Sequence, residues 1–379
     1  MFYKNARIFT SDFQFHTGGF SVTEDGKFGE VLPHKIPEDA IDLEGATVIP
    51  GLIDIHNHGN SGEDFSDGNT QCVTKMARYL AQNGITSFVA TTMTLPYPIL
   101  ETAFSAAASF AKENKPDCAR LLGIQMEGPY FSEKKKGAQN GAYLKKPDLP
   151  GFKKLFENCN GLVKIVGIAP ELECAEEFIK GAKDLCTVSV AHTDSGYEAA
   201  KNAFSAGASL LTHLFNGMPG IHHRNPGVIP AAAENANVFA ELICDGYHIH
   251  PAVVRLAFSI FGGERIVLIS DALRCCGMPD GDYELGGQPI TLSGGVARLS
   301  DGTLAGSSAN LYECMCRAMS FGIPEADAIR AATYNPACIL KENHRLGAIA
   351  PGMAADFLVC SADYSQKQVY LGGKLLTTE

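Results

Sequence analysis

Residues 52–58 read Leu52-Ile53-Asp54-Ile55-His56-Asn57-His58, an apolar run of strand length that ends in polar side chains. Successive side chains of a strand point to opposite faces, so His56 and His58 share one face and can reach one metal ion. The pair is a weak signal alone, because His248 and His250 have the same spacing. A polar strand end explains it equally well until further ligands are found.

The same kind of apolar run recurs through the middle of the chain, with helical stretches such as 70–82, 99–112 and 197–206 between the runs. This alternation over about 290 residues predicts a parallel (β/α)₈ barrel, a TIM-like α/β fold, with insertions. A doubly wound open sheet is the alternative, but no Gly-x-Gly-x-x-Gly or Gly-Lys-Ser/Thr loop follows any run. The runs are 52–55, 87–90, 121–126, 163–168, 187–191, 210–212, 238–243 and 266–269.

Both ends of the chain contain short strands and tight turns instead. Asp25-Gly26 separates two such strands near the start, and Gly372-Gly373 separates two near the end. Neither end is large enough to bury its own core, so we expect them to pair. The prediction is a small β-sandwich domain of residues 1–50 plus 345–379 beside a catalytic barrel of residues 51–344.

Composition disfavours a nucleic-acid-binding, membrane-spanning or secreted protein. The 379 residues include 31 Lys and Arg against 42 Asp and Glu, a net charge of −11, which argues against nucleic acid or an anionic membrane as the main partner. Twelve scattered cysteines without a CxxC motif favour reduced thiols and a cytoplasmic location. We find no signal peptide and no apolar run that could span a membrane.

Candidate metal ligands stand at the ends of other strand runs. The carboxyl ends of parallel barrel strands form one rim, so these distant residues should converge on a single site. Each has an ordinary structural explanation alone, but His, Glu and Asp together at one rim favour a catalytic divalent metal ion. The residues are Glu127 after the third run, His192 after the fifth, His213 after the sixth and Asp271 after the eighth.

A basic cluster follows in the later loops of this acidic chain. His222-His223-Arg224 and His248 provide cationic or hydrogen-bond donor groups, and arginine can bind phosphate through two parallel hydrogen bonds. The cluster therefore predicts recognition of an anionic small molecule. An exposed surface cluster without a ligand is the alternative.

Several longer motifs make the chain similar to a known family. From residue 50 to residue 356 it resembles the amidohydrolase superfamily, and within it the deacetylases of N-acetylated amino-sugar 6-phosphates. This resemblance implies a barrel with a β-sandwich built from both termini. The motifs are Glu127-Gly128-Pro129, Lys136-Gly137-Ala138, His213-Leu214-Phe215-Asn216, His222-His223-Arg224, Asp245-Gly246-Tyr247-His248, Ser270-Asp271-Ala272 and Gly302-Thr303-Leu304-Ala305-Gly306-Ser307.

The resemblance also implies roles for single residues. Glu127, His192 and His213 would hold the principal metal ion, Zn²⁺ or Fe²⁺. His56 and His58 would hold a second ion with Glu127 as the bridge, giving one or two ions per chain. Asp271 would be the general base and acid. The substrate-binding residues would be Ala138, Gln139, Asn216, Gly217, Arg224, His248, Leu304 and Ala305.

Two of these assignments carry further expectations. Arg224 would reach the phosphate from the second subunit of a homodimer. Gln139 stands where some relatives have a histidine beside the acyl group, and a neutral amide can donate to the acetyl oxygen but cannot become cationic.

The implied reaction is removal of the acetyl group from N-acetylglucosamine 6-phosphate, with a metal-activated water as nucleophile. The galactosamine epimer or another amide remains an alternative substrate. A carboxylated lysine at the end of the fourth strand is disfavoured, because that end reads Ile168-Ala169-Pro170-Glu171. A non-catalytic relative should have lost ligands that this chain retains.

Overall fold

The computed structural model describes residues 1–113 and 115–377. Its central sheet has eight parallel strands, as the sequence predicted. Asn57 forms a parallel bridge with Ala272, just beyond the last strand, so the first and last strands meet and the sheet nearly closes into a barrel. In sheet order the strands are β6 (Leu52–Asn57), β9 (Ile85–Thr92), β10 (Arg120–Met126), β11 (Val163–Ile168), β12 (Thr187–Val190), β13 (Leu210–Leu211), β14 (Phe239–Ile243) and β15 (Ile266–Ile269).

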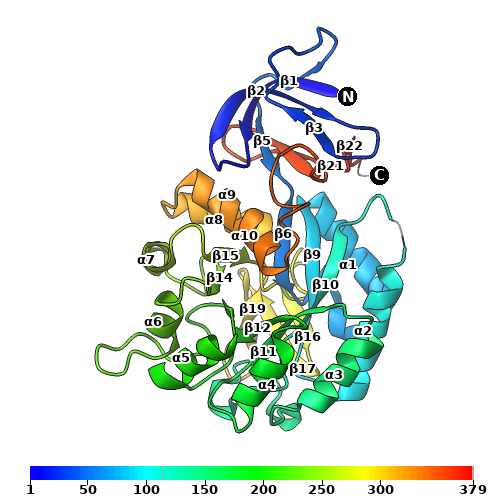
Figure 1. Cartoon of the computed structure of the whole chain (residues 1–379). Coiled ribbons are helices and arrows are strands. Elements are labelled where there is room, and N and C mark those ends of the chain that lie inside the picture. Colours follow the sequence, from blue (N-terminus) through cyan, green and yellow to red (C-terminus); the bar gives the residue numbers. More distant parts are fainter. Residues whose placement is uncertain (114, 378–379) are drawn as a thin grey trace.

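Helices cover the outside of this barrel (Figure 1). The helix expected at 99–112 lies at 97–110, because Pro98 occupies one of the first two helical positions, where no backbone N–H is required. No helix in the described ranges is long and apolar enough to cross a membrane. The α-helices are α1 (Thr70–Gln82), α2 (Tyr97–Phe110), α3 (Leu149–Asn158), α4 (Ala175–Ala182), α5 (Tyr197–Ala206), α6 (Val228–Ala233), α7 (Pro251–Phe261), α8 (Leu311–Ser320), α9 (Glu325–Ala332) and α10 (Tyr334–Ile339).

Both ends of the chain join one second sheet, drawn in blue and red at the top of Figure 1. Strands β5 and β20 pair antiparallel and connect the two ends. A buried aromatic cluster that includes Tyr3, Phe20 and Phe357 stabilises this sheet, with the Tyr3 and Phe20 rings stacked 4.8 Å apart. Its strands are β1 (Phe2–Phe9), β2 (Phe15–Val22), β3 (Phe28–Val31), β4 (Ile41–Asp42), β5 (Thr47–Pro50), β20 (Phe357–Cys360), β21 (Lys367–Leu371) and β22 (Lys374–Leu375).

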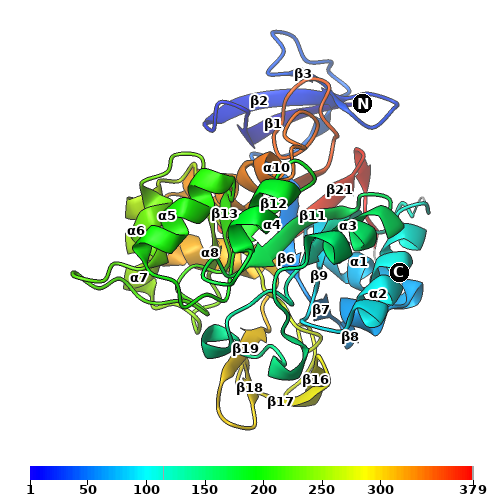
Figure 2. The same cartoon turned by 60° about the horizontal axis from the view of Figure 1, so that its bottom comes forward.

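A four-stranded antiparallel sheet follows β15 and projects from the bottom of Figure 2. The Gln288 amide anchors it to the barrel by donating to the Ala138 carbonyl oxygen at 2.7 Å. This insertion brings residues 303–306 to the cavity at the carboxyl end of the barrel. Its strands are β16 (Gly281–Leu285), β17 (Gln288–Ser293), β18 (Val296–Leu299) and β19 (Leu304–Ser307).

Short elements complete the loops at this end of the barrel. Strands β7 (Gly59–Asn60) and β8 (Glu63–Asp64) form a small hairpin directly after β6. Three 3₁₀ helices lie at η1 (Phe65–Asp67), η2 (Glu133–Lys135) and η3 (Gly141–Tyr143). The two later ones shape the loop between β10 and α3.

Candidate metal centre and its pocket

The predicted ligands meet at one end of the barrel, each at or just beyond the end of its strand. Three of them have left-handed backbone conformations, with φ of 43° at His192, 28° at His213 and 49° at Asp271. Residues with a Cβ rarely adopt such φ values, and this strain is typical of functional sites. The sharp turn after each strand directs these side chains into the barrel mouth.

Glu127, His192 and His213 form one compact group. Glu127 Oε1 lies 3.2 Å from His192 Nε2 and 3.1 Å from His213 Nε2. The other ring nitrogens face backbone carbonyl oxygens, His192 Nδ1 at 2.9 Å from Lys135 and His213 Nδ1 at 3.0 Å from Asn216. Each Nδ1–H is therefore a donor, which leaves both Nε2 lone pairs facing a carboxylate. A divalent cation between them fits this donor set.

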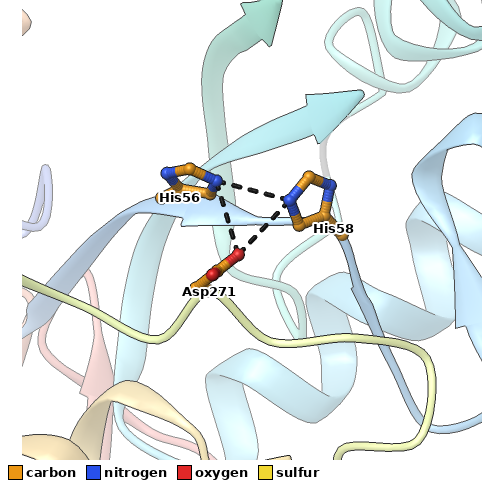
Figure 3. A group of neighbouring side chains, drawn as sticks. All are labelled: His56, His58 and Asp271. Atoms are coloured by element: carbon orange, nitrogen blue, oxygen red, sulfur yellow. Dashed lines mark hydrogen bonds and ion pairs between the residues drawn. The ribbon is translucent and has the colours of Figure 1, made fainter. Parts of the chain in front are cut away.

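His56, His58 and Asp271 form a second group beside the first (Figure 3). Asp271 Oδ1 lies 3.5 Å from His56 Nε2 and 3.3 Å from His58 Nε2. Glu127 connects the groups, since its Oε1 is 3.4 Å from His56 Nε2 and its Oε2 is 3.3 Å from His58 Nε2. The chain therefore has two adjoining sets of metal-binding side chains that share one carboxylate.

The electrostatics of both groups favour a cation. Burial alone would lower the pKa of His58, but hydrogen bonds to Asp271 and Glu127 raise it to about 9. Burial alone would raise the pKa of Glu127 and of Asp271, but the charge of His56 and the other nearby imidazoles lower both values. Both carboxylates therefore carry negative charge in a site that is almost sealed from water.

Gln139 contacts the metal-binding group through Glu127. Its Nε2 donates to Glu127 Oε2 at 2.6 Å, and its Oε1 accepts from the Thr94 backbone N–H at 2.7 Å. The Thr94 contact fixes the orientation of the amide, so the NH₂ group must face Glu127. Gln139 also lines the cavity, which leaves its second N–H available in that direction.

A cavity of about 250 Å³ lies over the two groups. Every predicted substrate-binding residue lines it except Arg224, which is exposed on the surface of its own chain. Both ring nitrogens of His248 already have partners, Asp245 at 2.7 Å and the Ala305 carbonyl oxygen at 2.8 Å. The lining residues predicted from sequence are His58, Glu127, Ala138, Gln139, His192, His213, Asn216, Gly217, His248, Asp271, Leu304 and Ala305.

Several residues of the site were not predicted from the sequence. Met93, Leu273 and Leu285 form an apolar wall of the cavity, and nothing in their local pattern marked them. Glu241 lies fully buried behind His56, with Oε2 2.9 Å from Nδ1. A charged residue inside the apolar run 238–243 was a usable signal for it, because such a carboxylate needs a partner in the barrel interior.

Comparison with protein families supports the predicted fold and the resemblance to a known family. The model of the "Amidohydrolase family" matches residues 47–376. This span includes the whole barrel and four of the eight strands of the terminal sheet, β5, β20, β21 and β22.

Similar proteins of known name and structure cover almost the whole chain. The N-acetylglucosamine-6-phosphate deacetylase of Vibrio furnissii is 37% identical, over 89% of this chain and 85% of its own. The N-acetylgalactosamine-6-phosphate deacetylase of Escherichia coli O157:H7 is 33% identical, over 93% of both chains. A mutant N-acetyl-D-glucosamine-6-phosphate deacetylase from Mycobacterium smegmatis, solved in complex with N-acetyl-D-glucosamine-6-phosphate, superposes with a TM-score of 0.94 at 30% identity, over 100% of this chain and 99% of its own.

Proposed function

Since the chain belongs to the amidohydrolase family, we propose that it hydrolyses the acetamide of N-acetylglucosamine 6-phosphate to glucosamine 6-phosphate and acetate. One observation carries this proposal: the Glu127 carboxylate joins two histidine groups at the floor of a cavity. The names of the similar proteins support the choice of substrate.

Glu127, His192 and His213 would hold the principal metal ion, Zn²⁺ or Fe²⁺. His56 and His58 would hold a second ion, with Glu127 as the bridging ligand. The donor types favour such an ion, and the backbone contacts of His192 and His213 leave their Nε2 atoms free to bind it. A bound divalent ion would lower the pKa of water towards neutrality and polarise the acyl oxygen.

Asp271 would move the proton in this reaction. Its carboxylate lies at the cavity floor, and the low pKa caused by His56 and His58 keeps it ionised and ready to accept. It would take a proton from the attacking water and return it to the leaving nitrogen, because an amine anion is a poor leaving group. Gln139 would hold Glu127 in place and direct its second N–H towards the acyl group.

The sugar phosphate would lie towards the loops after β13 and β14. The Asn216 side chain and the Gly217 backbone would bind it there, and His248 would bind it by exchanging its contact with the Ala305 carbonyl oxygen for one with the phosphate, while Ala138, Leu304 and Ala305 would form the walls. Arg224 would complete the phosphate site from the second subunit of a homodimer. Its exposure outside the cavity of its own chain supports a role across an interface.

The galactosamine epimer is the second candidate substrate. One observation favours it, since the E. coli O157:H7 protein named for that epimer is 33% identical over 93% of this chain. The two sugars differ at one hydroxyl, so the same metal chemistry serves both.

We also propose a cytoplasmic location. All twelve cysteines are free thiols, and most of them are buried. Free thiols are typical of a reducing compartment. Fractionation of the source cells would test this.

Acetate release from both epimeric sugar phosphates and from free N-acetylglucosamine tests the function. Each charge-assisted hydrogen bond to phosphate contributes roughly 1.5 to 3 kcal/mol, so losing two lowers kcat/KM about a hundredfold to ten-thousandfold. We expect N-acetylglucosamine 6-phosphate to be the best substrate and the free sugar a very poor one. Equal kcat/KM for the phosphorylated and free sugars would contradict the proposal.

A further inference from the structure

We propose that Glu241 is a positioning residue. It fixes His56 in the tautomer that can bind the second metal ion, and it connects the group of His56, His58 and Asp271 to the group that contains His213. The inference rests on the proposed metal site and concerns how the chain prepares it. Glu241 lies in β14 and is not among the residues that line the cavity. It therefore acts through His56 and does not contact the reacting atoms.

The surroundings of Glu241 show that His56 is its principal partner. The Glu241 side chain is fully buried, and within residues 1–113 and 115–377 it makes no ion pair with lysine or arginine. Its Oε2 contacts His56 Nδ1 at 2.9 Å and the His213 backbone N–H at 3.2 Å. A buried carboxylate is costly without partners. Both contacts involve Oε2, while Oε1 has no hydrogen-bond partner among the described residues.

The chemistry of this contact selects one tautomer of His56. A carboxylate only accepts hydrogen bonds, so His56 Nδ1 must carry a proton; in the neutral ring, the form that binds a metal ion, Nε2 then keeps its lone pair. That lone pair faces the shared metal-binding oxygens, 3.4 Å from Glu127 Oε1 and 3.5 Å from Asp271 Oδ1. Gln125 Nε2 lies 3.1 Å from the same Nδ1, and donation from that amide would require the opposite tautomer. Glu241 therefore decides which ring nitrogen is free for a metal ion.

The same carboxylate oxygen also reaches the first group, but less directly. It accepts from the backbone N–H of His213, whose side chain is held separately by the Asn216 carbonyl oxygen. Loss of the Glu241 charge should therefore lower the affinity for the second ion strongly and the affinity for the first ion little. This asymmetry separates positioning of His56 from a general loss of structure.

The test is Zn²⁺ titration of metal-free parent protein and of Glu241→Gln, which keeps the size of the side chain and removes its charge. Loss of a hydrogen-bond partner of a metal ligand typically weakens metal binding about 10- to 100-fold. We expect the second Zn²⁺ to bind that much more weakly, and the first to bind as in the parent. Glu198→Gln, on the exposed face of α5, is the control and should retain both affinities.

Two further measurements remove the ambiguity of a damaged fold. Co²⁺ spectra report each site directly, so the variant should lose the absorption of the second equivalent and keep that of the first. In zinc-loaded parent protein with ¹⁵N-labelled histidine, His56 should show a protonated Nδ1, assigned by its disappearance in His56→Asn. This second measurement does not depend on any Glu241 variant folding.

The outcomes distinguish this inference from the proposed function. If the parent binds two ions and Glu241→Gln binds both with unchanged affinity, the inference is wrong and the metal site stands. An unprotonated His56 Nδ1 in the zinc-loaded parent also overturns it. A parent protein that binds no ion overturns the proposed function and this inference together.

Discussion

Glu127 is the residue on which the site depends most. Its two oxygens lie within 3.4 Å of ring nitrogens from four histidines, which come from three different strand ends. Gln139 adds the contact that sets the angle of the carboxylate, because Thr94 fixes the orientation of the amide. The Gln139 side chain thus helps to orient the carboxylate that both metal-binding groups share.

Replacing Gln139 with leucine should damage turnover more than metal content. A hydrogen bond to a charged group contributes roughly 1.5 to 3 kcal/mol, so we expect kcat/KM to fall about tenfold to a hundredfold. All four histidines and Glu127 remain, so the first ion should stay bound. Steady-state kinetics with metal analysis of the same sample is the measurement.

Gln288→Leu is the matched control for this prediction. Gln288 donates to the Ala138 carbonyl oxygen, one residue before Gln139, and its hydrogen bond does not involve Glu127. The substitution removes a hydrogen bond that holds the same loop and changes no contact of the metal-binding group. Equal losses in the two variants would show that Gln139 acts only by holding the loop.

Much of the site at this scale was predictable, and the reason is geometric. Glu127, His192, His213 and Asp271 each end an apolar run, and a parallel barrel brings such ends together. The contact between Gln139 and Glu127 was not predictable, because it depends on how the loop after β10 folds back over the barrel. Loop conformation has no periodic signal in the sequence.

Among the elements, the turn after β13 has a steric requirement that acts directly on the site. Gly217 has φ of +60°, and a Cβ there would lie 2.9 Å from His192 Nδ1. The turn can pass this close to the His192 imidazole only because the side chain is absent.

Gly217→Ala should therefore weaken binding of the first metal ion. The added methyl group strains the turn and pushes the His192 ring away from Glu127. Metal content after dialysis against a weak chelator should fall relative to the parent. Gly220→Ala, in the same loop with no atom within 4 Å of its added Cβ, should retain parental metal content. Retention of metal in both variants would contradict this account of the turn.

The elements differ in how strongly the sequence indicates them. Long apolar runs placed 163–168 and 266–269 correctly at both ends, because a buried parallel strand is apolar on both faces. The β16–β19 sheet was missed, since its short strands alternate between buried and exposed residues. The glycine pairs Gly286-Gly287 and Gly294-Gly295, all with positive φ, were the available signal for its hairpins.

For the whole molecule, the central question is whether one chain makes a complete site. Arg224 is exposed and does not line the cavity of its own chain. If it acts across a dimer interface, two differently inactivated chains can complement each other.

Mixing Arg224→Ala with Asp271→Asn chains tests this. Each variant alone should turn over the phosphorylated substrate poorly, the first through lost phosphate binding and the second through lost proton transfer. After subunit exchange, about a quarter of the parental rate should return, because half the dimers are mixed and each mixed dimer holds one intact site. Mixed dimers that recover no activity would show that Arg224 does not act across the interface.

The most direct measurement is acetate release from N-acetylglucosamine 6-phosphate, recorded as metal-free protein is titrated with Zn²⁺ and, separately, with Fe²⁺ under anaerobic conditions. The proposed site, in which Glu127, His192 and His213 would hold the first ion, predicts no turnover without metal and a rate that rises with the first ion bound per chain. Glu127→Ala should stay inactive throughout the titration. Metal-free protein, or the Glu127→Ala variant, that releases acetate as fast as the fully loaded parent would contradict a metal-dependent deacetylase at this site.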